Sequence, residues 1–290
     1  MITGTTKLLG VIGNPVEHSL SPLMHNAALA RLDLNYVYLP FPIEPENLAK
    51  ALDGFAAIGV VGFNATIPHK QAIIPLLSEI EPVAQSVGAV NTVFRRDNKW
   101  IGTNTDVAGF IAPLKSLDRD WSQTHAVVLG NGGAARAVVY GCTQLGCASV
   151  TVVGRNLQKL EEFKDSWKDS PLKINLKIHQ WDFLAEIIAN TNLLVNTTPI
   201  GMYPNIDNSP INADLFAHLP KGTIIYDLIY TPSPTKFLQY AQQSELDTSR
   251  IVIDGLEMLV QQGAAALKIW LQQDVPVDVM RYSLQQKLYE

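Results

Sequence analysis

The chain has 290 residues, 47% of them hydrophobic, and carries a formal net charge of −5 at pH 7. This length allows two domains with sizeable cores, and the mildly acidic balance argues against nucleic acid as the main partner, because phosphate binding requires a basic face. The sequence has no membrane-spanning apolar run, secretion leader, disulfide framework or metal-ligand spacing, so we expect a cytoplasmic protein with no membrane association and no bound metal.

Short apolar runs alternate with helical patterns along the chain, which is typical of α/β architecture. The first part is predicted to contain strands separated by helices, followed by a β-hairpin that turns at Asp97-Asn98. The expected strands are 8–13, 36–41 and 60–64, the helices lie near 22–32 and 45–58, and the hairpin joins 89–95 to 99–103. Because a hairpin adds antiparallel strands, we predict a mixed sheet here.

The second part alternates strands and helices regularly and is predicted to form a Rossmann-type, doubly wound parallel sheet. Its expected strands are 126–130, 149–153, 193–196, 223–228 and 250–253. Two further helices, at 256–273 and 277–288, have no strand to cross to and are expected to fold back onto the first part. We therefore predict a substrate-binding, catalytic domain of residues 1–106 plus 255–290, and a cofactor-binding domain of residues 107–254.

A glycine-rich turn lies between the first strand of the second part and an amphipathic helix predicted over 134–145. Gly130 and Gly132 allow a tight turn and a close approach of the backbone to a pyrophosphate, and Ala135 is small enough for helix and strand to pack closely. The helix N-terminus adds unpaired N–H groups that favour anionic oxygens. The pattern therefore predicts a dinucleotide site.

The residue after the second strand of this part indicates which dinucleotide binds. An NAD-type fold usually has an acidic residue there, which accepts hydrogen bonds from the adenine ribose, but this chain has Arg155, with Lys159 one turn later. A guanidinium pairs with a 2′-phosphate, so NADP is favoured over NAD. The alternative is that both residues form the solvated start of a helix.

Two serines lie between the first predicted strand and the helix that follows it. Ligands of open α/β sheets usually bind at such strand-to-helix connections. Ser21 precedes Pro22 and is interpreted as a helix N-cap, a role that explains it without a ligand. Ser19 is not at a helix cap and has no comparable structural role. Its role stays open, and two hydroxyls beside a helix start could bind a carboxylate.

Lys70 falls in the first turn of a predicted helix, after Asn64 and Thr66 at the end of an apolar strand. The positive end of the helix dipole disfavours the ammonium form, which suits the amine to proton transfer, although an ordinary exposed lysine is the alternative. Asp106 is interpreted as the cap of the next helix. Were it instead close to Lys70, the two would form a proton-exchanging pair, but the spacing does not show that they meet.

These residues, taken in order, resemble the shikimate dehydrogenase family over essentially the whole chain. Each motif is common by itself, whereas the ordered set is specific. Besides the serine pair and the glycine turn, the motifs are 13–15, 64–70, 88–92, 104–106, 154–156, 196–202, 226–232 and 254–262. Family members often have Asn-Arg-Thr after the second cofactor strand, where this chain has Gly154-Arg155-Asn156, so the arginine is kept and a hydrogen-bonding side chain before it is lost.

The resemblance implies roles for individual residues. Lys70 and Asp106 would form the catalytic pair. The substrate would be bound by Ser19, Ser21, Asn64, Thr66, Asn91, Asp106, Tyr230 and Gln262, with the serines on its carboxylate. The cofactor would be bound by Gly130, Asn131, Gly132, Gly133, Ala134, Arg155 and Lys159, and its nicotinamide end by Thr197, Met202, Leu228 and Gly255.

The resemblance also implies an NADP-dependent oxidoreductase that interconverts 3-dehydroshikimate and shikimate in chorismate and aromatic amino-acid biosynthesis. A quinate or dual quinate/shikimate dehydrogenase is the alternative, decided by the room beside Ser19, Ser21 and Tyr230. A non-catalytic ligand sensor on the same fold is a remote alternative, since such a protein would lack the Lys70 and Asp106 pair. The expected assembly is a monomer or a homodimer.

Overall fold

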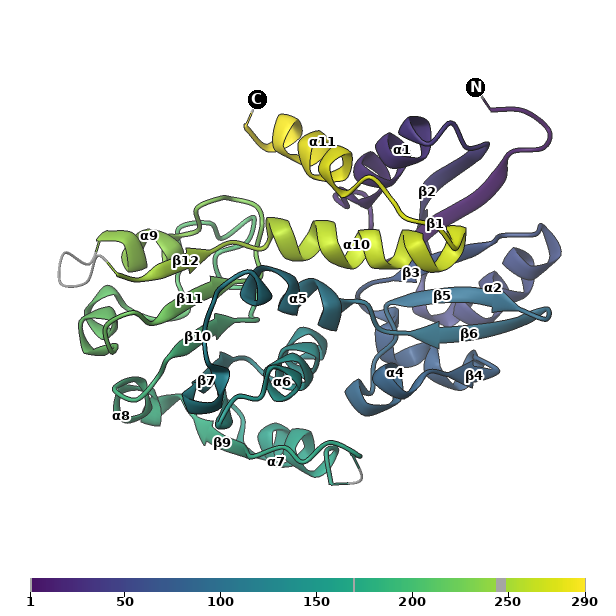
Figure 1. Ribbon diagram of the computed structural model, residues 1–290. Coiled ribbons are helices and arrows are strands. Elements are labelled where there is room, and N and C mark those ends of the chain that lie inside the picture. The colour runs from purple at the N-terminus through teal and green to yellow at the C-terminus, as the bar shows by residue number, and fades with distance from the viewer. Residues whose placement is uncertain (1, 169, 244–248, 290) are drawn as a thin grey trace. The chain divides into compact units, whose positions relative to one another are not determined.

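The structure is a computed structural model, which describes residues 2–168, 170–243 and 249–289 (Figure 1). The chain forms two compact units, Met1–Gly109 with Val260–Glu290 and Phe110–Leu259, and each contains one six-stranded sheet. The predicted boundaries, after residues 106 and 254, lie a few residues from these. Among the described residues, no helix combines the length and the apolar character needed to span a bilayer.

The sheet of the first unit is mixed, as predicted, with the strand order β2-β1-β3-β5-β6-β4. Strands β1, β2 and β3 run parallel, while β5 runs antiparallel to both β3 and β6. The strands are β1 (Lys7–Gly13), β2 (Tyr36–Pro42), β3 (Gly62–Ala65), β4 (Glu79–Ile80), β5 (Thr92–Arg96) and β6 (Lys99–Thr103). The helices are α1 (Ser21–Arg31), α2 (Leu48–Ala57), α3 (His69–Ala72), α4 (Pro82–Val87), α11 (Val277–Tyr289) and most of α10 (Leu256–Leu271), with 3₁₀ turns at Pro45–Asn47 and Ile74–Leu76.

Aromatic side chains from both ends of the chain pack around this sheet. Phe63 of β3 lies between Phe55 and Trp100, and both ring pairs meet edge to face, with centroids 5.3 and 5.4 Å apart. On α10, the Trp270 indole donates a hydrogen bond to the Val93 carbonyl of β5 at 3.0 Å. The end of the chain therefore folds back onto the first unit, as expected, and α11 packs against α1 (Figure 1).

The sheet of the second unit is parallel throughout, with the order β12-β11-β10-β7-β8-β9. Numbered within the unit, this is the 3-2-1-4-5-6 order of a dinucleotide-binding Rossmann fold, which confirms the prediction. The strands are β7 (His125–Leu129), β8 (Ser149–Gly154), β9 (Leu176–Gln180), β10 (Leu193–Asn196), β11 (Ile224–Asp227) and β12 (Ile251–Ile253). The helices are α6 (Gly133–Leu145), α7 (Leu157–Asp165), α8 (Leu184–Ile188), α9 (Lys236–Gln243) and most of α5 (Asp106–Lys115), with 3₁₀ turns at Trp121–Gln123, Trp181–Phe183 and Ala213–His218.

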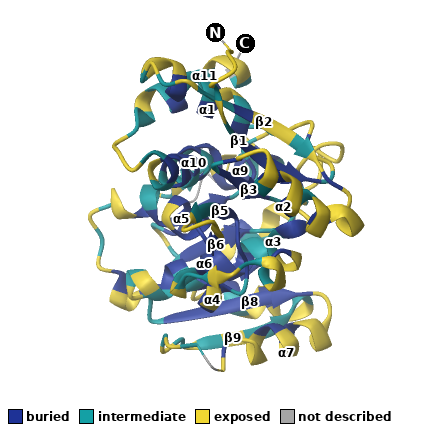
Figure 2. Cartoon of the chain, turned by 90° about the vertical axis from the view of Figure 1, so that its right-hand side faces the viewer, coloured by how far each residue is buried: buried dark blue, intermediate teal, exposed yellow. Residues whose placement is uncertain are grey.

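The strand order of the second sheet reverses between β7 and β10. Ligands of open α/β sheets bind beyond the carboxyl ends of the strands at such a reversal. The glycine turn follows β7 directly, and Thr197 follows β10. Strand β8 is buried beside this point, whereas the outer side of α7 is exposed (Figure 2). The fold therefore places the predicted dinucleotide turn at the expected position in the sheet.

Candidate active site

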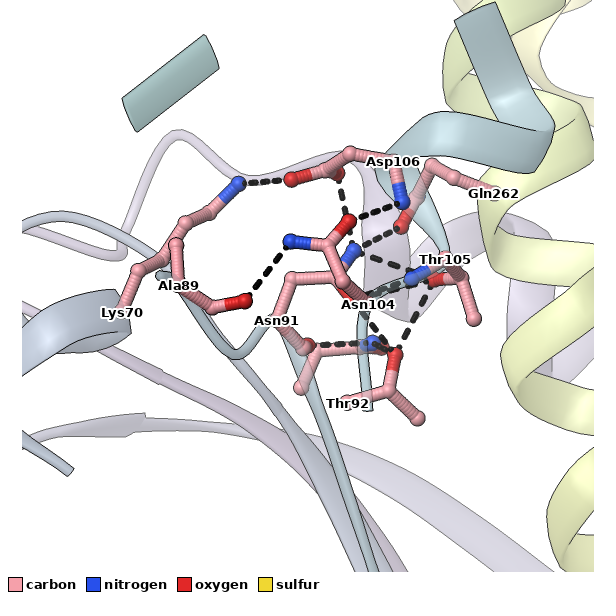
Figure 3. A network of polar contacts seen from close by, with 9 residues as sticks. Lys70, Ala89, Asn91, Thr92, Asn104, Thr105, Asp106 and Gln262 are labelled. Carbon is pink, nitrogen blue, oxygen red and sulfur yellow. Dashed lines mark hydrogen bonds and ion pairs between the residues drawn. The ribbon is translucent and has the colours of Figure 1, made fainter. Parts of the chain in front are cut away.

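Several strand ends meet at one edge of the first-unit sheet. Asn64 of β3 lies opposite Thr92 of β5, and Thr92 lies opposite Thr103 of β6. Because β5 runs antiparallel to its two neighbours, its beginning lies beside the ends of β3 and β6. Residues just outside these strand ends, including Lys70 and Asp106, therefore converge (Figure 3).

Lys70 and Asp106 form an ion pair at this edge. Lys70 Nζ lies 2.5 Å from Asp106 Oδ2, and the two side chains are 22% and 10% exposed. The backbone of Lys70 is fixed separately, since its carbonyl accepts from the Val90 N–H at 2.7 Å. The two groups thus meet although 36 positions separate them in the chain. The structure does not support the alternative of an ordinary exposed lysine.

Asp106 does not cap helix α5. It is the first residue of the helix, and its backbone N–H donates to Asn104 Oδ1 at 3.0 Å. Its carboxylate accepts from Lys70 on Oδ2 and from Asn91 Nδ2, at 2.8 Å, on Oδ1. The interpretation of Asp106 as a cap is therefore wrong. The Asn104 side chain accepts from the first N–H of the helix, and side chains of the site bind both oxygens of the Asp106 carboxylate.

The orientation of the Asn91 amide follows from a backbone donor. Asn91 Oδ1 accepts from the Thr105 backbone N–H at 2.7 Å, and this identifies the oxygen because an N–H only donates. Asn91 Nδ2 must then face Asp106 Oδ1, and it also lies 3.4 Å from Gln262 Oε1 on α10 (Figure 3). Asn91 is 2% exposed, so a buried amide holds the carboxylate in place.

A second buried polar group surrounds Asn64. The Tyr38 hydroxyl donates to Asn64 Oδ1 at 2.7 Å, and Asn64 Nδ2 donates to the Asn91 carbonyl at 3.0 Å. Tyr38 is fully buried and stacks on His25, with ring centroids 4.2 Å apart. Burial raises the pKa of Tyr38 and lowers the pKa of His25 to about 3, so both rings are neutral at physiological pH. Sequence analysis missed Tyr38, for which the available signal was a phenol on a predicted strand, since a buried phenol hydroxyl requires a polar partner.

Ser21 does not have the structural role that the sequence indicated, and Ser19, whose role the sequence left open, makes a local hydrogen bond. Helix α1 begins at Ser21 itself, with Leu20 at the capping position and no side-chain cap. Ser19 Oγ accepts from the Ser21 backbone N–H at 3.3 Å. The N-cap interpretation of Ser21 is therefore wrong.

The other predicted substrate residues are distributed over both units. Thr66 directly follows β3 and is partly buried, as is Gln262 on α10. Tyr230 belongs to the second unit, in the loop after β11, where burial raises the pKa of its phenol. Within the first unit, hydrogen bonds connect Lys70, Asp106, Asn91, Asn64 and Gln262.

The predicted dinucleotide turn has the backbone that a pyrophosphate site requires. Gly130 has a φ of +101°, in the region that favours glycine, and a Cβ there would lie 2.9 Å from Thr197 Oγ1. Gly132 is the N-cap of α6 without a side-chain cap, and a Cβ at Gly132 or Gly133 would meet open space. Ala135 is fully buried. The turn therefore presents the uncapped, accessible N-terminus of α6.

The remaining predicted cofactor residues follow other strands of the same parallel sheet, so they share its carboxyl edge. Arg155 and Lys159 are exposed, after β8 and in the first turn of α7. Gly255 follows β12 and packs so closely that a Cβ would lie 2.1 Å from the Leu228 carbonyl oxygen. Met202 is 49% exposed in the loop after β10. Asn131 and Ala134 are partly buried within the turn.

A buried carboxylate that sequence analysis did not single out organises the loop after β11. Asp227 Oδ1 accepts from Asn196 Nδ2 at 3.0 Å and from the Ile229 N–H at 3.1 Å, and Oδ2 accepts from the Thr235 hydroxyl at 2.6 Å. Burial raises the pKa of Asp227 to about 6, although the three donors oppose this shift. The carboxylate therefore holds both ends of the loop that contains Tyr230.

Family models match both ends of the chain. The substrate-binding domain of shikimate dehydrogenase matches residues 11–93, and the C-terminal domain of shikimate 5′-dehydrogenase matches residues 255–285. A shikimate dehydrogenase (NADP(+)) of Nostoc sp. (strain PCC 7120) is 68% identical over 98% of this chain and 98% of its own. The chain belongs to the shikimate dehydrogenase family.

Solved structures of shikimate dehydrogenases have the same fold. The enzyme of Aquifex aeolicus aligns with a TM-score of 0.87 at 39% identity, over 98% of this chain and 100% of its own. The enzyme of Thermus thermophilus, in complex with NADP(H) and shikimate, aligns with a TM-score of 0.83 at 32% identity, over 97% of this chain and 99% of its own. Both units of this shikimate dehydrogenase family member are therefore represented in solved relatives.

Proposed function

We propose that this protein catalyses the reversible, NADPH-linked reduction of 3-dehydroshikimate to shikimate. The proposal is carried by the Lys70–Asp106 ion pair, which the buried Asn91 amide holds at one edge of the first-unit sheet. A paired amine and carboxylate supply the proton exchange that reduction of a ketone requires. The 68% identity to a shikimate dehydrogenase (NADP(+)) supports this substrate among the cyclic hydroxy acids.

The second unit has the chemistry to hold NADP. The uncapped N-terminus of α6 and the open space around Gly132 and Gly133 suit a pyrophosphate. The exposed guanidinium of Arg155 suits a 2′-phosphate, which a carboxylate at this position would repel. When bound, NADPH supplies the hydride. We assign the nicotinamide end to Thr197, Met202, Leu228 and Gly255, which follow neighbouring strands at the same sheet edge.

Lys70 is assigned the proton transfer. Ketone reduction develops negative charge on the substrate oxygen, and the Lys70 ammonium donates a proton to it, directly or through one water. In the oxidation direction, the neutral amine accepts this proton from the substrate hydroxyl. Asp106 holds Lys70 Nζ at 2.5 Å, and Asn91 keeps the Asp106 carboxylate oriented.

The substrate itself would be held by polar groups around the same edge. Ser19 and Ser21 stand at the start of α1, where the helix dipole favours a carboxylate. The ring hydroxyls are assigned to Asn64, Thr66, Asn91, Asp106 and Gln262. The family resemblance also assigns Tyr230, of the second unit, to the substrate. These groups offer both donors and acceptors, as several hydroxyls on one ring require.

An assay of four substrate and cofactor pairs tests the proposal. Purified protein is given shikimate or quinate, each with NADP⁺ or NAD⁺, and formation of the reduced cofactor is followed by its absorbance. We expect kcat/KM for shikimate with NADP⁺ to exceed the other three values by about tenfold or more. A higher value for quinate, or turnover of neither acid, would contradict the proposal.

A further inference from the structure

We propose that Thr92 is a positioning residue of this active site, whose buried hydroxyl links the side-chain amides of Asn64 and Asn91 and restrains both against rotation. Its effect on catalysis rests on the proposed function, whereas its effect on the two amides does not.

Thr92 lies where the two polar groups of the site join. It is the first residue of β5 and is fully buried. Its Oγ1 lies 3.1 Å from Asn64 Nδ2, 3.0 Å from Asn91 Oδ1 and 3.0 Å from Thr105 Oγ1. Figure 3 shows it beneath Asn91, on the side of that amide facing away from Lys70. One hydroxyl therefore contacts side chains supplied by three separate segments of the first unit.

The direction of each hydrogen bond follows from groups that have only one role. Asn64 Nδ2 faces the Asn91 backbone carbonyl, which only accepts, so this end of the Asn64 amide is the nitrogen. Asn91 Oδ1 faces the Thr105 backbone N–H, which only donates, so this end of the Asn91 amide is the oxygen. The Thr92 hydroxyl must then accept from Asn64 and donate to Asn91.

Thr92 thus completes a directed chain of hydrogen bonds to the ion pair. The chain runs from Tyr38 to Asn64, through Thr92 to Asn91, and from Asn91 Nδ2 to Asp106. All five residues are buried, so a donor or acceptor that loses its partner here is not compensated by bulk water. Without the hydroxyl, both amides lose a bond that opposes their rotation. We therefore expect substrate binding to weaken before the fold does.

Two substitutions separate the hydroxyl from the methyl group of Thr92. Thr92→Val keeps the shape and removes the hydroxyl, whereas Thr92→Ser keeps the hydroxyl and removes the methyl group. We expect Thr92→Val to raise the KM for shikimate about tenfold and to lower kcat by a smaller factor, with the KM for NADP⁺ within about twofold of wild type. Thr92→Ser should keep both values of KM within about threefold of wild type. If Thr92 only packed against its neighbours, Thr92→Ser would be the more impaired variant, because serine leaves a small cavity and valine does not.

A second measurement needs no substrate. In protein labelled with nitrogen-15 asparagine, hydrogen exchange of the Asn64 and Asn91 side-chain amides is followed by NMR. Thr92→Val should speed this exchange about tenfold, and Thr92→Ser should leave it near the wild-type rate. If Thr92→Val is not recovered folded, Thr92→Ala, which needs no additional space, replaces it with the same expectations.

The outcomes distinguish this inference from the proposed function. Wild-type protein that does not oxidise shikimate, together with faster amide exchange in Thr92→Val, refutes the function and supports the positioning role. Active wild-type protein with unchanged KM and unchanged exchange in Thr92→Val overturns the positioning role and leaves the function in place. Equal impairment of Thr92→Val and Thr92→Ser also overturns it.

Discussion

Replacing Lys70 by alanine would remove the amine to which we assign proton transfer while leaving its surroundings in place. The backbone at this position is held by the Val90 N–H, which bonds the Lys70 carbonyl at 2.7 Å independently of the side chain. The Lys70 side chain is 22% exposed, so water can enter the space that the amine leaves, and the Asn91 amide still binds the Asp106 carboxylate. Lys70→Ala should therefore fold, and any loss of activity should come from the chemistry.

The size of that loss follows from the assigned role. A positioned general acid contributes roughly 10²- to 10⁴-fold to rate, which corresponds to about 3 to 5 kcal/mol of transition-state stabilisation. Lys70→Ala should lower kcat by this factor. The KM for shikimate should change little, because the amine acts on charge that develops only in the transition state.

Steady-state kinetics with shikimate and NADP⁺ measure both values. Lys50→Ala, on the exposed side of α2 in the same unit, is the matched control and should retain wild-type kinetics. Lys70→Arg keeps a positive charge beside Asp106, but a guanidinium stays protonated and cannot accept the proton of the substrate hydroxyl, so its kcat should stay as low as that of Lys70→Ala. A kcat for Lys70→Ala within about tenfold of wild type would refute the assignment.

Three further substitutions test other parts of the structure. Arg155→Asp should raise the KM for NADP⁺ by about ten- to a hundredfold without raising that for NAD⁺, and an equal rise for both would contradict the 2′-phosphate assignment. The raised pKa of Asp227, about 6 against an ordinary 3.8, means that the folded state binds the additional proton, so its contribution to stability grows as pH falls through 6. In urea unfolding, wild type should therefore gain stability, on the order of 1 kcal/mol, relative to Asp227→Asn between about pH 7.5 and pH 5, and a constant difference would refute this. A Cβ at Gly62 would lie 2.2 Å from Trp270 Nε1, so Gly62→Ala should lower the free energy of unfolding by about 2–3 kcal/mol. Gly54→Ala, which meets no atom within 4 Å, is its control, and equal stability of the two variants would contradict this account.

Local sequence patterns were sufficient for most of the fold. Alternation of short apolar runs with helical patterns predicted the α/β class, and the glycine turn before residues 134–145 predicted the Rossmann unit. Strand β4 was missed because its two residues are too few to show a period. Strand β9 was missed because it is a partly exposed edge strand, stabilised by pairing with β8 rather than by an apolar pattern of its own.

The candidate site was only partly accessible from the sequence. Residue types at strand ends, such as Lys70 and Asp106, identified groups capable of the chemistry, since a motif fixes which atoms are present. Whether a carboxylate caps its own helix or pairs with an amine 36 positions away depends on sheet register, and register is a property of long-range strand pairing. For the same reason, only the tertiary structure identified Thr92 and Tyr38. Both hydroxyls are buried, so the asparagine amides beside them have no bulk water to bond in their place.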